Sequence, residues 1–134
     1  MLKTGVKNNP TKEVGQSNQI IRHLGKHLVF DLWDCVNLNS VEIVEQALSE
    51  AVKVCGATLL YLKTHSFSPY GVSGFAMLSE SHISIHTWPE HKYAAIDIFT
   101  CGERVVPYNS LPVFRKFFKP KHMEIVDLKR GSML

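Results

Sequence analysis

Apolar and polar residues follow two different periods along this chain, and the periods divide it into strands and helices. From 25 to 35, successive side chains alternate between a mostly apolar set and a mixed set, which is typical of a strand in a half-covered sheet. From 40 to 55, apolar residues recur every three or four positions, which predicts an amphipathic helix. Gly56 is a suitable residue to end that helix.

Further elements are expected along the rest of the chain. The pattern predicts strands at 57–66, 72–79, 82–88, 92–100 and 122–130, and a helix at 109–118. The short links between the central strands favour antiparallel neighbours. The resulting order, β-α-β-β-β-β-α-β, predicts an α+β fold: a two-layer sandwich with both helices on one face of an antiparallel sheet.

The uncovered face of this predicted sheet is far from uniformly polar. Such a face needs a cover, and a second copy of the same sheet is the simplest one, because most oligomers are symmetric. We therefore expect a homodimer in which two sheets stack.

Length and composition fit one domain. A chain of 134 residues with 45% hydrophobic residues has room for one core but not for two. No run approaches the roughly 18 apolar residues of a membrane span, and the polar start lacks the apolar segment of a secretory signal. We therefore expect a cytoplasmic protein without a membrane partner, with a flexible tail at 1–23 and a single domain at 24–134.

Charge and cysteine content exclude other classes. The net charge is only +3, and the basic residues are scattered, so we expect no nucleic-acid partner. Three widely spaced cysteines form neither a disulfide framework nor a structural zinc motif.

The segment 67–101 has an unusual density of reactive side chains, and at its centre the hydroxyl of Ser81 follows the carbonyl of Glu80. Attack of this hydroxyl on the carbonyl carbon would replace the amide by an ester, provided that strain and hydrogen bonds to the oxyanion favour it. Loss of the Ser81 α-proton would then expel the Glu80 carboxylate and leave dehydroalanine, which hydrolyses to a pyruvoyl group. The sequence is therefore compatible with a chain that cleaves itself and makes its own cofactor.

Ser73, His82 and His86 are local candidates for the proton transfers that this chemistry needs. In a regular strand, His82 and His86 share one face and Ser81 lies on the other. His86 would reach Ser81 only across a bent or bulged backbone; otherwise a base from a neighbouring strand would act. We therefore predict an irregular backbone at the bond that precedes Ser81.

Each of these residues also has an ordinary structural interpretation. Strand histidines are more often hydrogen-bonded parts of the structure than catalysts, and Cys101 would by default be a buried hydrophobe. Phe67 would ordinarily be a core aromatic, and Glu90 a solvated turn residue. A metal site formed by His82, His86 and Cys101 lacks a further ligand at convincing spacing, so no metal is predicted.

Four motifs extend this pattern. They are GKHLV at 25–29, PYGVSG at 69–74, SESHISIHTWPE at 79–90 and YAAIDIFTCG at 93–102. Together they resemble the prokaryotic S-adenosylmethionine decarboxylase proenzymes, pyruvoyl enzymes of polyamine biosynthesis. The similarity spans about residues 24–130, and the motif at 79–90 is long and specific.

The resemblance implies self-cleavage between Glu80 and Ser81, into a β chain of residues 1–80 and an α chain of 81–134. The pyruvoyl group made from Ser81 would form a Schiff base with S-adenosylmethionine and release carbon dioxide, giving the decarboxylated product used for spermidine synthesis. The known family dimer also presses two sheets together. The same match implies that His86 is the proton acceptor in processing, Ser73 serves processing and the active site, Cys101 is the proton donor, Phe67 stacks on adenine and Glu90 holds the ribose.

Two alternatives stay open at this point. The same pyruvoyl chemistry could act on arginine, because small changes in a pocket switch substrates. A non-cleaving regulatory paralogue could also keep the fold, although the intact set of Glu80, Ser81, His86 and Cys101 argues against it.

Overall fold

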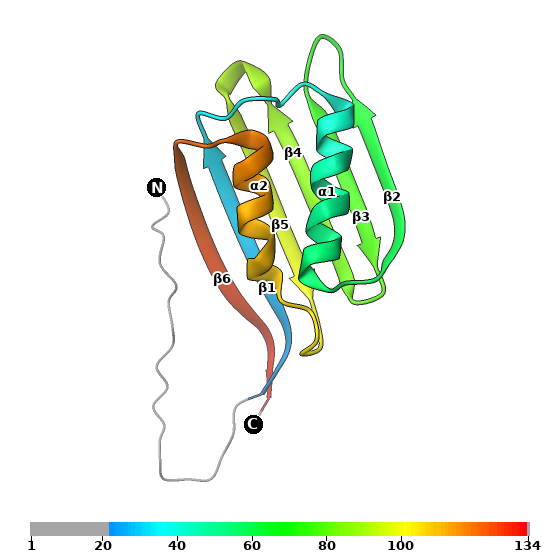
Figure 1. Ribbon diagram of the computed structural model, residues 1–134. Helices are drawn as coiled ribbons and strands as arrows, with labels where there is room; N and C mark the ends of the chain where they lie inside the picture. The colour runs from blue at the N-terminus through cyan, green and yellow to red at the C-terminus, as the bar shows by residue number, and fades with distance from the viewer. Residues whose placement is uncertain (1–21, 134) are drawn as a thin grey trace.

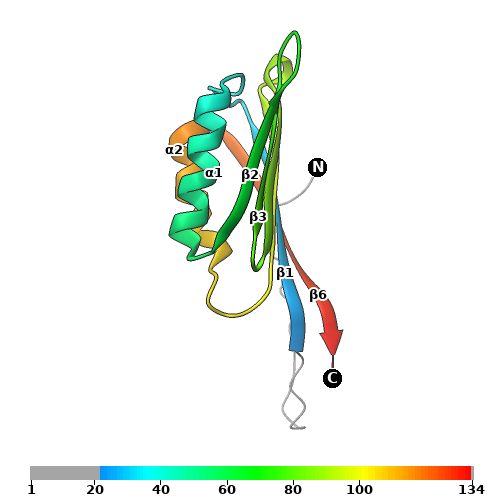
Figure 2. The ribbon, with the colours of Figure 1, turned by 90° about the vertical axis from the view of Figure 1, so that its right-hand side faces the viewer.

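The computed structural model describes residues 22–133, which form two layers: a six-stranded antiparallel sheet and two helices (Figure 1). The strand order is β2-β3-β4-β5-β1-β6, and both helices cover the same face of the sheet (Figure 2). The predicted α+β sandwich and its element order are therefore confirmed. The elements are β1 (Arg22–Trp33), α1 (Val41–Cys55), β2 (Leu59–Ser66), β3 (Val72–Leu78), β4 (Ser81–Trp88), β5 (Tyr93–Thr100), α2 (Leu111–Phe118) and β6 (His122–Met133), with short 3-10 segments η1 (Pro89–His91) and η2 (Pro107–Ser110).

The first and last strands are longer than the sequence pattern predicts. β1 begins at Arg22 rather than at 25, so Arg22 and His23 belong to the sheet and not to a tail, and β6 extends to Met133 rather than to 130. These ends pair with each other, from Arg22 opposite Met133 to Trp33 opposite His122. Backbone pairing between the strands thus overrides polar local sequence. The rest of the predicted tail, residues 1–21, lies outside the described residues.

The helix α1 is well defined at both ends. The Ser40 hydroxyl accepts a hydrogen bond from the Ile43 backbone N–H at 3.2 Å, an N-cap that satisfies one of the unpaired donors of the first turn. Gly56 ends the helix at φ 76°, a left-handed conformation that glycine adopts without a steric penalty. One apolar stripe of α1 is buried against the sheet: Val44, Ala47, Leu48, Ala51, Val52 and Cys55.

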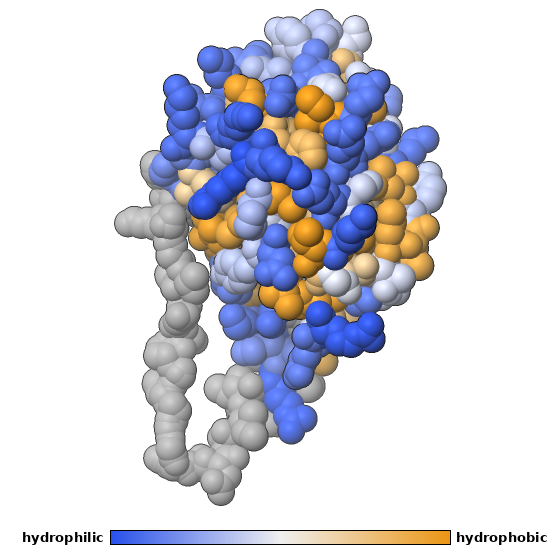
Figure 3. Space-filling model, viewed as in Figure 1, coloured by the Kyte–Doolittle hydropathy of each residue, from blue (hydrophilic) through white to orange (hydrophobic). Residues whose placement is uncertain are grey.

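The core lies between the helices and the sheet. Alternate residues of β1, β4 and β5 are buried there in one cluster with Phe114 and Phe118 of α2. The outer side of the helices presents mainly hydrophilic residues with apolar ones between them (Figure 3). Within residues 22–133, neither helix is long and apolar enough to cross a bilayer.

No described element covers the opposite face of the sheet (Figure 2), which we call the open face. Its side chains are not uniformly polar, as the sequence predicts. Several large apolar residues there are 39–55% exposed: Trp33, Tyr61, Phe75, Met77 and Trp88.

Candidate active site

The residues singled out from the sequence lie at the two ends of β4. Ser81 begins this strand beside the β3–β4 hairpin, and Cys101 directly follows the adjacent strand β5. The loop after β2 and η1 lie at the other end of the sheet (Figure 1). We call Glu80, Ser81 and Cys101 the cleavage end, and Phe67, Ser73, His86 and Glu90 the histidine end.

The backbone at the cleavage end is strained. Leu78 pairs with Ser81, so Ser79 and Glu80 form a two-residue turn. Ser81 has φ 138°, a conformation that non-glycine residues rarely adopt and that costs on the order of 1–3 kcal/mol. The predicted irregular backbone is therefore confirmed. It is not a bulge, because the pairing of Ser81 with Leu78 and Thr100 continues in unbroken register along both neighbouring strands.

The carbonyl oxygen of Glu80 faces hydrogen-bond donors of Cys101. The Cys101 backbone N–H donates to it at 3.1 Å, and the Cys101 thiol lies 3.6 Å from the same oxygen. This oxygen would carry the negative charge if the Ser81 hydroxyl attacked the Glu80 carbonyl carbon. The cleavage end thus holds a donor in place before any charge develops, which is the arrangement that stabilises an oxyanion.

The side chain of Glu80 is held separately by Thr58, in the loop between α1 and β2. The Thr58 backbone N–H donates to one carboxylate oxygen at 3.0 Å, and its hydroxyl donates to the other at 3.3 Å. The bond from the Thr58 N–H is the main reason why the pKa of the Glu80 carboxyl lies below its usual value. Sequence reasoning missed Thr58, because a threonine in a loop belongs to no motif or periodic pattern.

The histidine end is organised by side chains on the open face. Ser73 and His86 are directly opposite each other on β3 and β4, and the Ser73 hydroxyl lies 2.9 Å from Nδ1 of His86. Phe67 is 50% exposed and packs edge-on against His65, with ring centroids 4.6 Å apart. Glu90 is exposed on η1. Phe67 is therefore not a core aromatic, and its ring is available to a ligand.

One chain does not bring the two ends together. Five residue steps separate Ser81 from His86, which is about 17 Å along a strand. No bulge in β4 shortens this path. Local bending therefore does not place His86 beside Ser81, and the alternative metal set of His82, His86 and Cys101 is not assembled. Cys101 is also exposed, contrary to its default interpretation as a buried hydrophobe.

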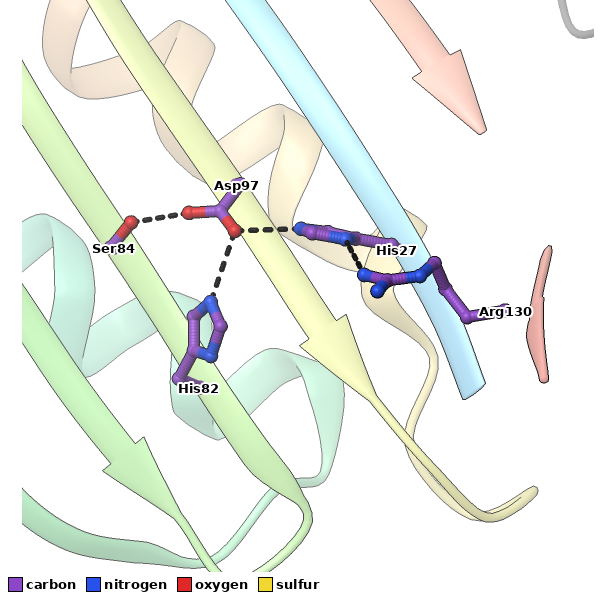
Figure 4. Close-up of polar contacts among 5 residues, drawn as sticks. All are labelled: His27, His82, Ser84, Asp97 and Arg130. Carbon is purple, nitrogen blue, oxygen red and sulfur yellow. Dashed lines mark hydrogen bonds and ion pairs between the residues drawn. The ribbon is translucent and has the colours of Figure 1, made fainter. Parts of the chain in front are cut away.

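The third candidate base, His82, belongs to a hydrogen-bond network on the open face (Figure 4). Nε2 of His82 and Nε2 of His27 both donate to the same Asp97 oxygen, at 3.0 and 2.7 Å, and Ser84 donates to the other. Burial raises the pKa of Asp97, but these hydrogen bonds offset it and leave the pKa below its usual value. Asp97 thus fixes the orientation of His82 and the proton on its Nε2.

This network also has a defined proton arrangement. Arg130 lies 3.1 Å from Nδ1 of His27, and an arginine only donates. His27 therefore carries its proton on Nε2, where it donates to Asp97. A histidine that binds metal through Nε2 needs that nitrogen bare and donates from the other one. The side chains of His27, His82 and Asp97 lie close together. The Nε2 atoms of both histidines donate to Asp97, so these nitrogens are not bare as metal ligands must be.

A pocket of about 850 Å³ opens beside the cleavage end. Thr100 and Cys101 form one wall of it. Arg22, Lys26 and Lys129 also line it, together with Glu103, so its charged lining is three basic side chains and one acidic one. Thr100 pairs with Ser81, and its buried hydroxyl has no hydrogen-bond partner among the described residues.

These features define a class of protein: an α+β sandwich with a strained backbone at Ser81, the residue with which β4 begins. The S-adenosylmethionine decarboxylase family model matches residues 26–131 of this chain. Sequence relatives named S-adenosylmethionine decarboxylase proenzyme include those of Methanococcus aeolicus, 56% identical over 116 residues (85% of this chain and 99% of the relative), and Thermomicrobium roseum, 48% identical over 115 residues (85% and 99%). The chain belongs to the S-adenosylmethionine decarboxylase family.

A solved structure agrees with this assignment. The crystal structure of the adenosylmethionine decarboxylase from Aquifex aeolicus VF5 has a TM-score of 0.78 and 33% sequence identity to this chain. The match covers 84% of this chain and 95% of the solved one. The similarity therefore extends over most of this chain and nearly all of the solved one.

Proposed function

We propose that this chain is a proenzyme that cleaves itself between Glu80 and Ser81 and then decarboxylates S-adenosylmethionine. The observation that carries the proposal is the strained Ser81, φ 138°, with the Glu80 carbonyl oxygen held by the Cys101 N–H. The names of the relatives support both the precursor state and the substrate. No structural feature favours arginine or a non-cleaving paralogue.

The first step is an N-to-O acyl shift. The Ser81 hydroxyl oxygen bonds to the Glu80 carbonyl carbon, the C–N bond breaks, and the hydroxyl proton ends on the freed amine. The Cys101 N–H stabilises the oxyanion formed on the way. Strain at Ser81 drives the shift, because breaking the peptide bond releases its backbone from the positive φ.

The second step removes the Ser81 α-proton and needs a base. The electron pair forms the Cα–Cβ double bond while the Cβ–O bond breaks, so that Glu80 leaves as a carboxylate. Water then replaces the nitrogen of the resulting dehydroalanine, ammonia departs, and the pyruvoyl group remains at the start of the 81–134 chain. We assign the proton transfers of processing to His86, with Ser73 beside it at 2.9 Å.

Because His86 lies about 17 Å along the strand from Ser81 of its own chain, we assign it to Ser81 of the partner subunit. Two sheets that stack on their open faces with opposed strand directions would place the histidine end of one chain over the cleavage end of the other. Regular alternation puts Ser81 on the opposite face, so its irregular backbone, φ 138°, would have to expose it to this contact. The half-exposed apolar side chains of the open face, such as Phe75 and Met77, would be covered by the same contact. The homodimer would then contain two composite sites.

The residues of both ends suit the pyruvoyl group and the substrate. Once formed, this group supplies an electrophilic carbonyl and an electron sink for decarboxylation. The exposed Cys101 thiol lies against the carbonyl that precedes residue 81, which suits a proton donor to the substrate. We assign adenine stacking to the exposed ring of Phe67 and binding of the ribose hydroxyls to Glu90, both from the histidine end.

Intact mass measurement tests processing. Freshly purified chain, incubated at neutral pH, should convert from one species of 15.2 kDa to two fragments that end at Glu80 and begin at residue 81, the latter without a free amine. Cleaved protein should then release carbon dioxide from S-adenosylmethionine and not from arginine. A single uncleaved species after long incubation contradicts the proposal.

A further inference from the structure

Thr58 makes three hydrogen bonds to the two residues that precede Ser81. Besides the two bonds to the Glu80 carboxylate, at 3.0 and 3.3 Å, its carbonyl oxygen accepts from the Ser79 N–H at 3.0 Å. The loop that carries Thr58 lies at the same end of the sheet as the β3–β4 hairpin (Figure 1). A single residue from outside the hairpin thus contacts the whole turn, through both its backbone and its side chain.

The two residues before Thr58 are hydrogen-bonded to the end of α1. The N–H of Gly56 donates to Lys53, and the N–H of Ala57 donates to Val52, both at 3.1 Å. Val52 and Ala51 are buried in the core. Thr58 therefore directly follows a backbone segment that is hydrogen-bonded to a packed helix, and its own bonds link this segment to the hairpin turn.

A strained backbone persists only where the surrounding structure fixes it from several sides. On one side of the scissile peptide, β4 is paired from Ser81 onward between β3 and β5. On the other side, the Glu80 carbonyl is held by one backbone hydrogen bond from Cys101. Without a hold on Glu80, rotation of the peptide plane would relieve the strain and turn the carbonyl away from the Cys101 N–H.

We infer that Thr58 is a positioning residue for self-cleavage: its grip on the Glu80 carboxylate keeps the scissile peptide strained and its carbonyl on the Cys101 N–H. This inference rests on the proposed function. Thr58 touches no reacting atom and acts through the side chain of Glu80. Its loss slows cleavage without changing the decarboxylation chemistry of chains that have been cleaved.

The matched experiment compares Thr58→Val with Thr64→Val. Thr64 on β2 makes the same kind of bond, from its hydroxyl to the Glu45 carboxylate at 2.7 Å, but contacts no residue of the hairpin turn. Freshly produced precursor is followed by intact mass, and the cleavage rate is measured together with the melting temperature. Thr58→Val should cleave about 3- to 10-fold more slowly, as expected for the loss of one hydrogen bond, while Thr64→Val stays within about twofold of wild type.

Three further measurements separate positioning from general instability. Thr58→Ser keeps the hydroxyl and should restore the wild-type cleavage rate. Glu80→Ala removes both acceptors and should slow cleavage more than Thr58→Val does. Decarboxylation per cleaved chain should be the same in Thr58→Val and wild type.

The outcomes distinguish this inference from the proposed function. If the wild-type chain never cleaves, the proposed function is wrong. If the wild type cleaves but Thr58→Val matches Thr64→Val in rate, or Thr58→Ser cleaves as slowly as Thr58→Val, the positioning role is overturned.

Discussion

The two ends of β4 are built in different ways. At the cleavage end, backbone groups make the decisive contacts, with the Cys101 N–H on the Glu80 carbonyl and a strained φ at Ser81. At the histidine end, the contacts are between side chains, with Ser73 against His86. One end thus holds a peptide bond under strain and the other holds a candidate base.

This difference suggests why a precursor survives long enough to fold. Strain and oxyanion stabilisation are present in a single chain, but the base lies about 17 Å away along β4. On the proposed mechanism, β-elimination waits until the open faces of two chains meet. Assembly then precedes completion of the cofactor, and an isolated chain stays intact.

The largest expected effect is the complete loss of self-cleavage in two single variants and its return when they are mixed. Ser81→Ala and His86→Ala chains should each stay uncleaved alone, because each lacks one half of every composite site. Refolded together at equal amounts, about half of the His86→Ala chains should cleave, since random pairing places about half of them in mixed dimers with an intact partner histidine end. Mass spectrometry distinguishes the two chains. Cleavage of His86→Ala alone, or none in the mixture, would contradict the composite site.

The next largest effect concerns Cys101, which has two separate roles at the cleavage end. Cys101→Ala keeps the backbone N–H that contacts the Glu80 carbonyl and loses only the thiol. Self-cleavage should therefore proceed, while kcat for decarboxylation falls by about 10²- to 10⁴-fold, the usual contribution of a positioned proton donor. Cleavage and carbon dioxide release are measured on the same sample. Normal turnover by this variant would exclude the thiol as the proton donor.

A moderate effect is expected next to Ser73, where α1 packs closely on the sheet. A Cβ at Gly74 would lie 2.8 Å from Cδ1 of Leu48 and 3.1 Å from Cγ2 of Ile85. Gly74→Ala should lower the free energy of unfolding by about 1–3 kcal/mol, as overpacking of a core does. Urea denaturation measures it. Gly102→Ala tests the other penalty, because the added atom meets open space but φ is 85°. Gly74 has no positive φ, so a Gly74→Ala chain as stable as wild type would argue against overpacking.

The smallest expected effect is the pH dependence at Glu80. The pKa of its carboxyl is lowered in the folded chain, chiefly by the Thr58 N–H. The stabilisation of the folded chain by the hydrogen bonds to the ionised Glu80 carboxylate is therefore complete above the unfolded-state pKa. It is lost as the pH falls through the lowered folded-state pKa. Cleavage should slow by a few-fold at acidic pH. The cleavage rate of Glu80→Gln should not fall in this way at acidic pH. If the rates of both proteins fall equally at acidic pH, another group causes the dependence.

Several features of the fold follow directly from local sequence. The alternation in β1 and the three- or four-residue period of α1 determine which faces meet in the core, because side-chain direction depends only on position along an element. The extra residues of β1 and β6 are different. Arg22, His23 and the segment after Arg130 look like loop by composition, and only pairing between distant strands makes them part of the sheet.

The candidate site likewise has features that follow from local sequence and features that depend on distant contacts. The adjacency of Glu80 and Ser81 is covalent, and the motif around it is readable without any structure. The strand alternation also places Ser81 and His86 on opposite faces, which predicts an irregular backbone if the two residues act together. The positive φ of Ser81 and the contacts of Glu80 with Cys101 and Thr58 are different, because these partners are about 20 residues away in sequence.

The sequence by itself therefore determined the order of elements and the family, and it located the bond that we propose is cleaved, since each depends on neighbouring residues or on a continuous motif. The tertiary structure alone showed that the candidate base His86 and the bond before Ser81 lie toward opposite ends of one unbulged strand. It also showed that His82 is hydrogen-bonded to Asp97 and that Thr58 donates hydrogen bonds to the Glu80 carboxylate. These features depend on the register between strands and on the loop that follows α1, and no local pattern specifies which distant residues such pairing brings together.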